Sequence, residues 1–164
     1  MIDQQRAHTR ILFDFFMTQI EKSQGITQQM LFPEVLELSA DDDLFFEQIL
    51  PDLQRVGFDF DPAGNNSYRV KGIPAQIGKS SVIDLLLDML DKAKTTAQDP
   101  TASLHESISL TLAESSSLKA GQRLSSEEMS DLIDRLFGCA NYNFTPDGKK
   151  IVTTFTQDEL EKRF

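Results

Sequence analysis

The stretch "DQQRAHTRILFDF", residues 3–15, combines apolar residues at helical spacing with polar side chains of the kinds found in metal sites. It begins with Asp3, carries His8 in its middle and has Asp14 near its end. The apolar residues recur at steps of three and four: Ala7, Ile11, Leu12, Phe15, Phe16 and Ile20. This spacing predicts an amphipathic helix over 4–24, with the following glycine as its C-cap. The stretch itself allows three interpretations: an intact metal-binding helix, a disabled one, or only the buried face of a helix.

The rest of the chain mixes helical and extended patterns. Further helices are expected over 40–56, 81–96, 102–117 and 124–137 and near the C-terminus, strands over 28–38, 58–60, 67–74 and 151–156, a turn at 61–66 and a linker at 96–100. Pro33 must lie at a strand edge or a bulge, and Pro51 predicts a kink or a break in its helix. Ser125 and Glu128 form a capping box. Because helices and strands follow no regular βαβ order, the predicted class is α+β.

The composition fits one folded domain, or two small lobes that share a core. Forty per cent of the 164 residues are hydrophobic, and the net charge is −10 at pH 7. So acidic a chain repels a phosphate backbone, and weak or no direct DNA binding is expected. A zinc site would need carboxylates besides Cys139, His8 and His105, the only cysteine and histidines. Without an apolar run of about 20 residues or a signal peptide, a cytoplasmic location and no membrane contact are expected.

Five stretches, taken in order, resemble the C-terminal domain of the MutL DNA mismatch repair family. They are "IDQQRAHTRILFDF", "QQMLFPEVLEL", "YRVKGIPA", "LKAGQRLSSEEMSDLIDRLF" and "FTQDELEKRF". The resemblance implies a dimerisation lobe formed by 1–24 and 118–164, and an inserted outer, regulatory lobe over 25–117. The family's domain starts about two strands earlier. Its N-terminal ATPase domain, which binds ATP and magnesium, lies outside these 164 residues, so no cofactor is expected in this domain.

Many members of this family are metal-dependent nicking endonucleases, and their helix motif is only partly present here. The motif has the form D-Q-H-A-x-x-E-x-x-x-x-E, and the resemblance places its first residue on Asp3 and its last acid on Asp14. Its histidine corresponds to Gln5 and its first glutamate to Thr9. His8 does not replace the missing histidine, because neighbouring helix positions point about 100° apart. We expect His8 to be a surface or partly buried helix residue.

Two further motifs of the nuclease site are also degenerate. An A-C-R segment corresponds to 113–115, where Glu114 replaces the thiol, and a C-P-H-G-R-P segment corresponds to 145–150, where Thr145 and Asp147 replace the soft ligands. Hydroxyl and amide groups are poor substitutes for thiolate and imidazole as ligands of zinc or manganese. The resemblance therefore predicts a lost nuclease with no metal site. The alternative is a divergent nicking endonuclease that holds a hard metal ion between Asp3, Asp14 and Asp147.

The stretch "QQMLFP" (28–33) resembles the peptide by which some MutL domains contact the replication sliding clamp. The residues that would bind are Gln28, Met30, Leu31 and Pro33. A pocket on the clamp can accept the amide by hydrogen bonds and the apolar side chains by burial. The alternative is an ordinary half-buried strand.

The leading hypothesis is an interaction module rather than an enzyme. The resemblance implies a homodimer that holds two ATPase arms together so that they close on DNA. Buried apolar area would stabilise it, supplied by the exposed apolar faces of the first and last helices. The expected partners are a second copy, the sliding clamp and other mismatch repair proteins through the full-length chain, which would be associated with the nucleoid.

Overall fold

A computed structural model describes residues 1–78, 81–97 and 103–161. The helices are α1 (Gln4–Lys22), α2 (Ala40–Arg55), α3 (Val82–Ala97), α4 (Leu104–Ser116), α5 (Ser126–Phe137) and α6 (Gln157–Glu161). The strands β1 (Thr27–Glu37), β2 (Asp59–Gly64) and β3 (Ser67–Pro74) form an antiparallel sheet in the order β1-β3-β2. The α+β class is confirmed. The predicted linker at 96–100 lies partly outside the described residues.

Helix α1 begins where the sequence predicts but ends earlier. Asp3 is its N-cap and accepts a hydrogen bond from the backbone N–H of Arg6, and Ser23 ends it in the left-handed conformation. The expected C-cap at Gly25 is therefore wrong. Gly25 instead lies against the segment after α2, donating its N–H to the carbonyl of Arg55 at 2.9 Å. A Cβ at this position would meet backbone atoms at 2.4 Å, so the close approach of two chain segments requires the glycine.

Strand β1 carries a bulge around Pro33, as the proline predicts. Gln29 stands opposite Gly72 of β3, and Glu34 stands opposite Val70. The four residues between them on β1, 30–33, therefore correspond to one residue on β3 and leave the regular ladder. We call residues 30–33 the β1 bulge. The bulge releases the proline, which has no N–H to donate, from the pairing that it could not complete.

Two other expectations based on local sequence are corrected by the structure. Of the kink or break expected at Pro51, the break does not occur: α2 continues to Arg55, and Ile49 and Leu53 on either side of the proline are buried and hold the helix in place. The predicted turn at 61–66 is shorter, because β2 continues to Gly64 and Asn66 makes the turn with a positive φ of 53°.

The predicted strand at 151–156 does not form. Within the described residues its only pairing is an isolated antiparallel bridge between Val152 and Ile2. The N–H of Asp3 donates to the carbonyl of Ile151, and the N–H of Thr153 donates to that of Met1. The sequence has strand character, but the described residues form no continuous ladder here, and Ile151 donates its N–H to the carbonyl of Asn143 at 2.8 Å.

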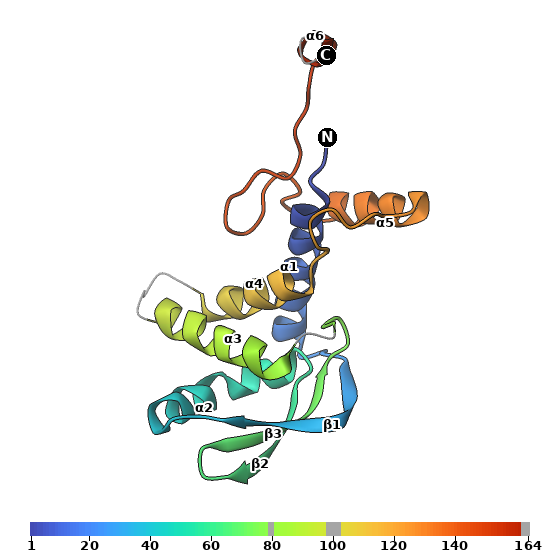
Figure 1. The fold of residues 1–164 in the computed structure, drawn as a ribbon. Coiled ribbons are helices and arrows are strands. Elements are labelled where there is room, and N and C mark those ends of the chain that lie inside the picture. Colours follow the sequence, from blue (N-terminus) through green and yellow to red (C-terminus); the bar gives the residue numbers. More distant parts are fainter. Residues whose placement is uncertain (79–80, 98–102, 162–164) are drawn as a thin grey trace.

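Two separate clusters of buried apolar side chains lie at the two ends of α1. The larger involves α1, α2, α3, α4 and the sheet, and includes Phe13, Phe16 and Phe46. The smaller contains Ala7, Ile11, Leu132, Leu136 and Ile151. Figure 1 shows the sheet with α2 and α3 at one end of α1, and α5 with the C-terminal segment at the other. The apolar face of α1 is thus buried inside its own chain, and the expectation that it is exposed for dimerisation is wrong.

Two further phenylalanines pack against the larger cluster. Phe15 packs edge to face against Phe16 with 5.6 Å between ring centroids, and Phe45 is partly buried against the larger cluster. No helix in the described part of the chain is long and apolar enough to cross a membrane.

Candidate functional site

A polar pocket of about 370 Å³ brings together most of the residues that the nuclease motifs single out. It is lined by Gln5, Arg6, Thr9, Glu114, Ser117, Thr145, Asp147 and Lys149. Three segments that lie far apart in the sequence form it: the first turns of α1, the end of α4 and the loop at 145–149. We call it the motif pocket. Gln5 and Thr9 both reach it because residues four apart lie on one face of a helix.

The other two residues of the predicted set lie elsewhere. Asp3 caps α1 and forms an ion pair with Arg6 at 3.3 Å, and it does not line the motif pocket. Asp14 forms an ion pair with Arg10 at 2.6 Å. Nine residues separate Asp14 from Gln5, which places the two side chains about 180° apart around the helix. The structure therefore separates Asp14 from the pocket that Gln5 lines.

The loop that carries Thr145 and Asp147 is held by hydrogen bonds of its own. The Thr145 hydroxyl accepts the N–H of Lys149 at 2.8 Å, and the Lys149 ammonium lies 2.7 Å from the Asp147 carboxylate. Hydrogen bonds from Lys149 and then from Thr145 keep the pKa of Asp147 below its usual value. At neutral pH the Asp147 carboxylate is therefore ionised, and the adjacent Lys149 ammonium balances its negative charge.

The charges in the motif pocket do not fit a two-metal centre. The pocket contains the carboxylates of Glu114 and Asp147. The Lys92 ammonium lies 3.5 Å from the Glu114 carboxylate, and Lys149 forms the ion pair with Asp147. Arg6 adds a further positive charge and donates a hydrogen bond to the carbonyl of Lys150 at 2.8 Å. Cations beside the ligands oppose the binding of a divalent metal. Across residues 1–78, 81–97 and 103–161, no group of three His, Cys, Asp or Glu side chains is arranged to hold a metal.

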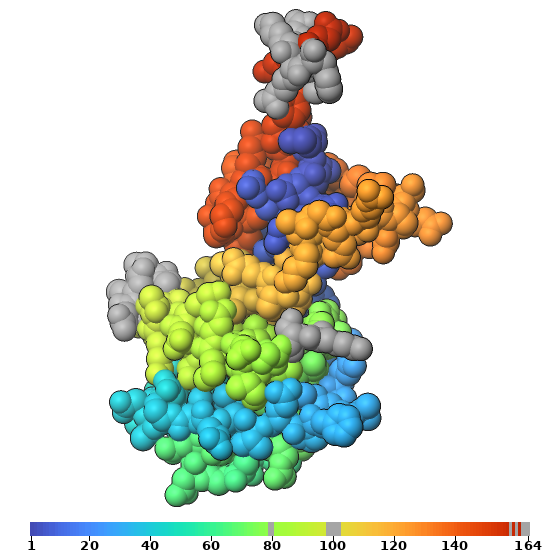
Figure 2. Space-filling view, in the orientation of Figure 1, coloured from blue at the N-terminus to red at the C-terminus, as the bar shows by residue number. Residues whose placement is uncertain are grey.

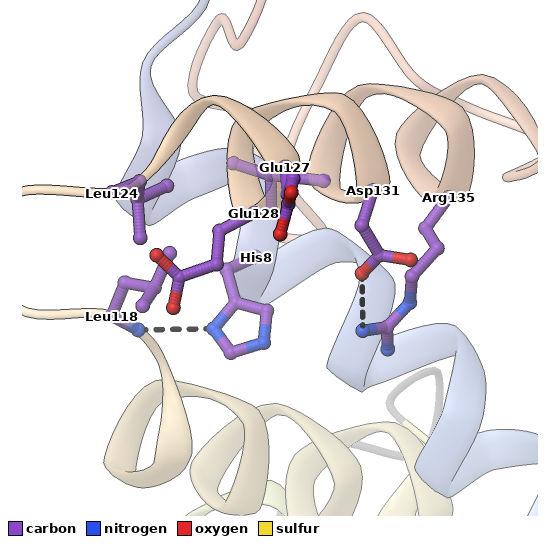
Figure 3. A pocket seen from close by; sticks show the side chains of 8 residues that line it. His8, Leu118, Leu124, Glu127, Glu128, Asp131 and Arg135 are labelled. Atoms are coloured by element: carbon purple, nitrogen blue, oxygen red, sulfur yellow. Dashed lines mark hydrogen bonds and ion pairs between the residues drawn. The ribbon is translucent and has the colours of Figure 1, made fainter.

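His8 lines a different pocket, between α1, the segment after α4 and α5, with a volume of about 410 Å³ (Figure 3). Its Nδ1 accepts the backbone N–H of Leu118 at 3.0 Å, which ties α1 to the segment that follows α4. Burial, and then the positive charge of Arg135, lower the pKa of His8. Across the pocket, Arg135 forms an ion pair with Asp131 at 3.5 Å. His8 is partly buried, as expected, and its neutral imidazole connects α1 to the loop after α4.

Cys139 is also a packing residue. Its side chain is partly buried beside the smaller apolar cluster, and its thiol lies 3.5 Å from the Arg135 carbonyl. Burial and then the negative charge of Asp14 raise the pKa of Cys139 to about 11. The group is a neutral thiol at physiological pH, which removes it from consideration as a reactive nucleophile.

The β1 bulge exposes part of the predicted clamp-binding peptide. Leu31 is 92% exposed and the adjacent Phe32 is 84% exposed, whereas Met30 is partly buried against the larger cluster. Gln28 and Pro33 are exposed, although the backbone of Gln28 pairs with Ile73 of β3. The prediction followed the family peptide and omitted Phe32, which strict alternation along a strand would place on the same face as Met30. The proline in the motif was the signal that this alternation fails here.

Comparison with known proteins places the chain in a family. The model of the MutL C terminal dimerisation domain matches residues 1–124. The chain belongs to the MutL C-terminal dimerisation domain family. DNA mismatch repair protein MutL of Parabacteroides distasonis is 43% identical over 164 residues, which is all of this chain and 27% of that protein. The MutL proteins of Bacteroides fragilis and Clostridium botulinum are 41% and 34% identical over the whole chain, which covers 26% and 25% of them.

The chain therefore spans about a quarter of the length of these MutL proteins. The family model includes α1, the sheet and α2 to α4, and so contains the β1 bulge and two of the three segments of the motif pocket. The alignments with the MutL relatives continue beyond it through α5 to the end of the chain. The resemblance read from five short stretches is confirmed over the full length.

Proposed function

We propose that this chain is the homodimerisation domain of a MutL-like DNA mismatch repair protein and holds two N-terminal ATPase arms together. The match to a dimerisation-domain model over residues 1–124 carries this proposal. The relatives are about four times as long as the chain, which leaves room in them for an ATPase domain. ATP and magnesium would bind there, and the domain itself would act by burying surface between copies. Contacts with other mismatch repair proteins, and a place at the nucleoid in the cytoplasm, would come through the full-length protein.

The proposed organisation is two lobes, with 1–24 and 118–164 as the dimerisation lobe and 25–117 as the outer lobe. The two buried clusters support this division, because the smaller one draws only on α1, α5 and C-terminal residues. Helix α1 belongs to both, since Phe13, Phe16 and Ile20 pack into the larger cluster. In this arrangement α1 connects the lobes.

The homodimer can be tested by light scattering over a wide concentration range. We expect a mass of twice the chain mass of 18.5 kDa, persisting at low micromolar concentration. The physical reason is that apolar surface exposed in one copy is removed from water in the pair. A mass that stays at the value for one chain up to high micromolar concentration would contradict the proposal.

We further propose that the motif pocket has no nuclease activity. Glu114 and Thr145 stand where the nuclease motifs of the family have cysteine, and Gln5 stands where they have histidine. The carboxylates of the pocket form ion pairs with lysines. The alternative of a divergent endonuclease needs Asp3, Asp14 and Asp147 around one ion, and these side chains lie in different surroundings.

Metal titration separates these two possibilities. We expect no saturable binding of Mn²⁺ or Zn²⁺ in calorimetry up to millimolar metal, and no nicking of supercoiled plasmid with Mn²⁺. Tight binding that is lost in Asp3→Asn, Asp14→Asn and Asp147→Asn but kept in Asp41→Asn would instead favour the endonuclease. Asp41→Asn is the matched control, because it removes an exposed carboxylate on α2, outside the motif pocket.

The third part of the proposal is that the β1 bulge binds the replication sliding clamp. Leu31 and Phe32 form an exposed apolar pair beside Pro33 on a segment that has left the regular ladder. An edge strand with projecting apolar side chains is well suited to insertion into a pocket on a partner. Of the residues predicted from the sequence, Met30 contributes least, because it already packs against the core of its own chain.

A further inference from the structure

Helix α5 has a second apolar face that the described part of the chain leaves exposed. Leu132 and Leu136 are buried in the smaller cluster, whereas Met129, Ile133 and Phe137 are 45%, 40% and 53% exposed. These three residues are spaced four apart, so they form a continuous line along the helix. It lies about 60–100° around the axis from the buried leucines. A surface helix that packs only against its own domain is typically apolar only on the side that faces the core.

The line of apolar side chains continues past the end of the helix. The ring of Tyr142 lies against that of Phe137, with 5.0 Å between the centroids, and Tyr142 is itself exposed. We call Met129, Ile133, Phe137 and Tyr142 the α5 stripe. Figures 1 and 2 show α5 projecting from the rest of the molecule, at the end away from the sheet. The stripe is therefore separate from the β1 bulge.

The pattern of the stripe is complementary to itself. Met129 and Phe137 lie four residues before and after Ile133, at about −40° and +40° around the helix. If two copies of α5 pack antiparallel about a two-fold axis at Ile133, each Ile133 meets its counterpart and each Met129 meets the Phe137 of the second copy. A flexible methionine opposite an aromatic ring is a favourable contact. Antiparallel packing also places the positive end of each helix dipole beside the negative end of the other.

The charge of the chain and its family together favour a second copy over a nucleic acid or a membrane. The net charge of −10 opposes a nucleic acid or an anionic membrane. The apolar face of α1, which the sequence suggested for dimerisation, is buried in its own chain. Aromatic and methionine side chains are the types enriched at the centres of protein interfaces.

We propose that the α5 stripe is the surface through which two copies of this chain meet, with Ile133 at the two-fold axis. This inference rests on the homodimer of the proposed function and adds the residues that form its centre. A stable interface buries about 800 Å² on each partner, so further residues around the four of the stripe complete the contact.

Disulfide trapping tests the position of the axis. The variant Ile133→Cys, made in a Cys139→Ser background, should form a covalent dimer under mild oxidation at low micromolar concentration. Helices packed about 8–10 Å apart bring residues that face each other across the axis within the Cα separation that a disulfide allows. Leu44→Cys in the same background is the matched control, because Leu44 is a 64% exposed leucine on α2. It should remain uncross-linked.

Solution mass tests the energetic importance of the stripe. Ile133→Glu and Phe137→Glu should each shift the mass from two chains to one at concentrations where the unaltered protein is a dimer, and Leu44→Glu should not. Circular dichroism spectra that match the unaltered protein establish that the variants fold. An unaltered protein that is monomeric at every concentration overturns the proposed homodimer itself. A dimer that survives both glutamate variants and gives no cross-link through position 133 overturns only the stripe as its interface.

Discussion

Phe16→Ala is expected to lower the free energy of unfolding by about 3–5 kcal/mol, the usual loss when a fully buried phenyl ring is removed. Phe16 is 0% exposed and belongs to the larger cluster, to which α1 to α4 and the sheet contribute. Its ring also makes an edge-to-face contact with Phe15. The cavity left behind cannot close easily, since α1 is held at both ends by separate clusters. Chemical denaturation followed by circular dichroism measures the change.

The matched control for this prediction is Phe32→Ala, which removes the same ring from a site that is 84% exposed. We expect its free energy of unfolding to change by less than about 0.5 kcal/mol, as is usual for surface positions. If the two variants lose similar stability, the burial of Phe16 is not what stabilises α1. If Phe16→Ala unfolds cooperatively at an unchanged denaturant midpoint, the prediction is wrong.

The double variant Leu31→Ala/Phe32→Ala is expected to weaken binding to the purified sliding clamp by about thirtyfold or more. Truncating an anchor side chain in a desolvated pocket typically costs about 2 kcal/mol or more, which corresponds to this factor. Both side chains project from the β1 bulge and contribute little to the core, so the variant should keep its fold. Surface plasmon resonance with immobilised clamp provides the affinity.

Val35→Ala is the control for the clamp experiment. Val35 is also an exposed apolar residue of β1, but it lies beyond the bulge in regular pairing with Arg69 of β3. Its truncation should leave clamp affinity within about twofold, the range of an energetically neutral contact. Equal affinities for the double variant and the unaltered protein would show that the bulge is not the contact. A similar loss in Val35→Ala would move the contact away from the bulge.

Apolar spacing and capping residues, which lie within a single segment, correctly predicted two of the helices. The spacing of Ile11, Phe16 and Ile20 identified α1, and Ser125 with Glu128 identified the start of α5, where both capping hydrogen bonds form. The same kind of reasoning was wrong at Gly25, where glycine is needed for contact with Arg55 and its neighbours, thirty residues away. It was also wrong for 151–156, where the described pairing is an isolated bridge between Val152 and Ile2 and not a strand. Both errors arise from tertiary surroundings that a single segment does not encode.

The candidate site was predicted in part, and only through the family resemblance. The motifs singled out Gln5, Thr9, Glu114, Thr145 and Asp147, which lie in three distant segments and line one pocket. No periodicity in the sequence connects these segments. Asp3 and Asp14 do not line the pocket, although Asp14 could have been excluded by its angular distance from Gln5 along the helix. The lysines beside Glu114 and Asp147 come from tertiary contacts or from a loop conformation that the sequence does not specify.

The position of α1 between the two buried clusters affects how the chain is made. Ala7 and Ile11 are covered by Leu132 and Leu136, which follow them by about 125 residues. At about 5–20 residues per second, a ribosome needs roughly 6–25 s to synthesise that interval. Phe13, Phe16 and Ile20 gain partners as α2 to α4 emerge, so the C-terminal half of α1 is covered earlier. The N-terminal turns stay uncovered during that interval, and in the cell they are the part of this helix that a chaperone can reach.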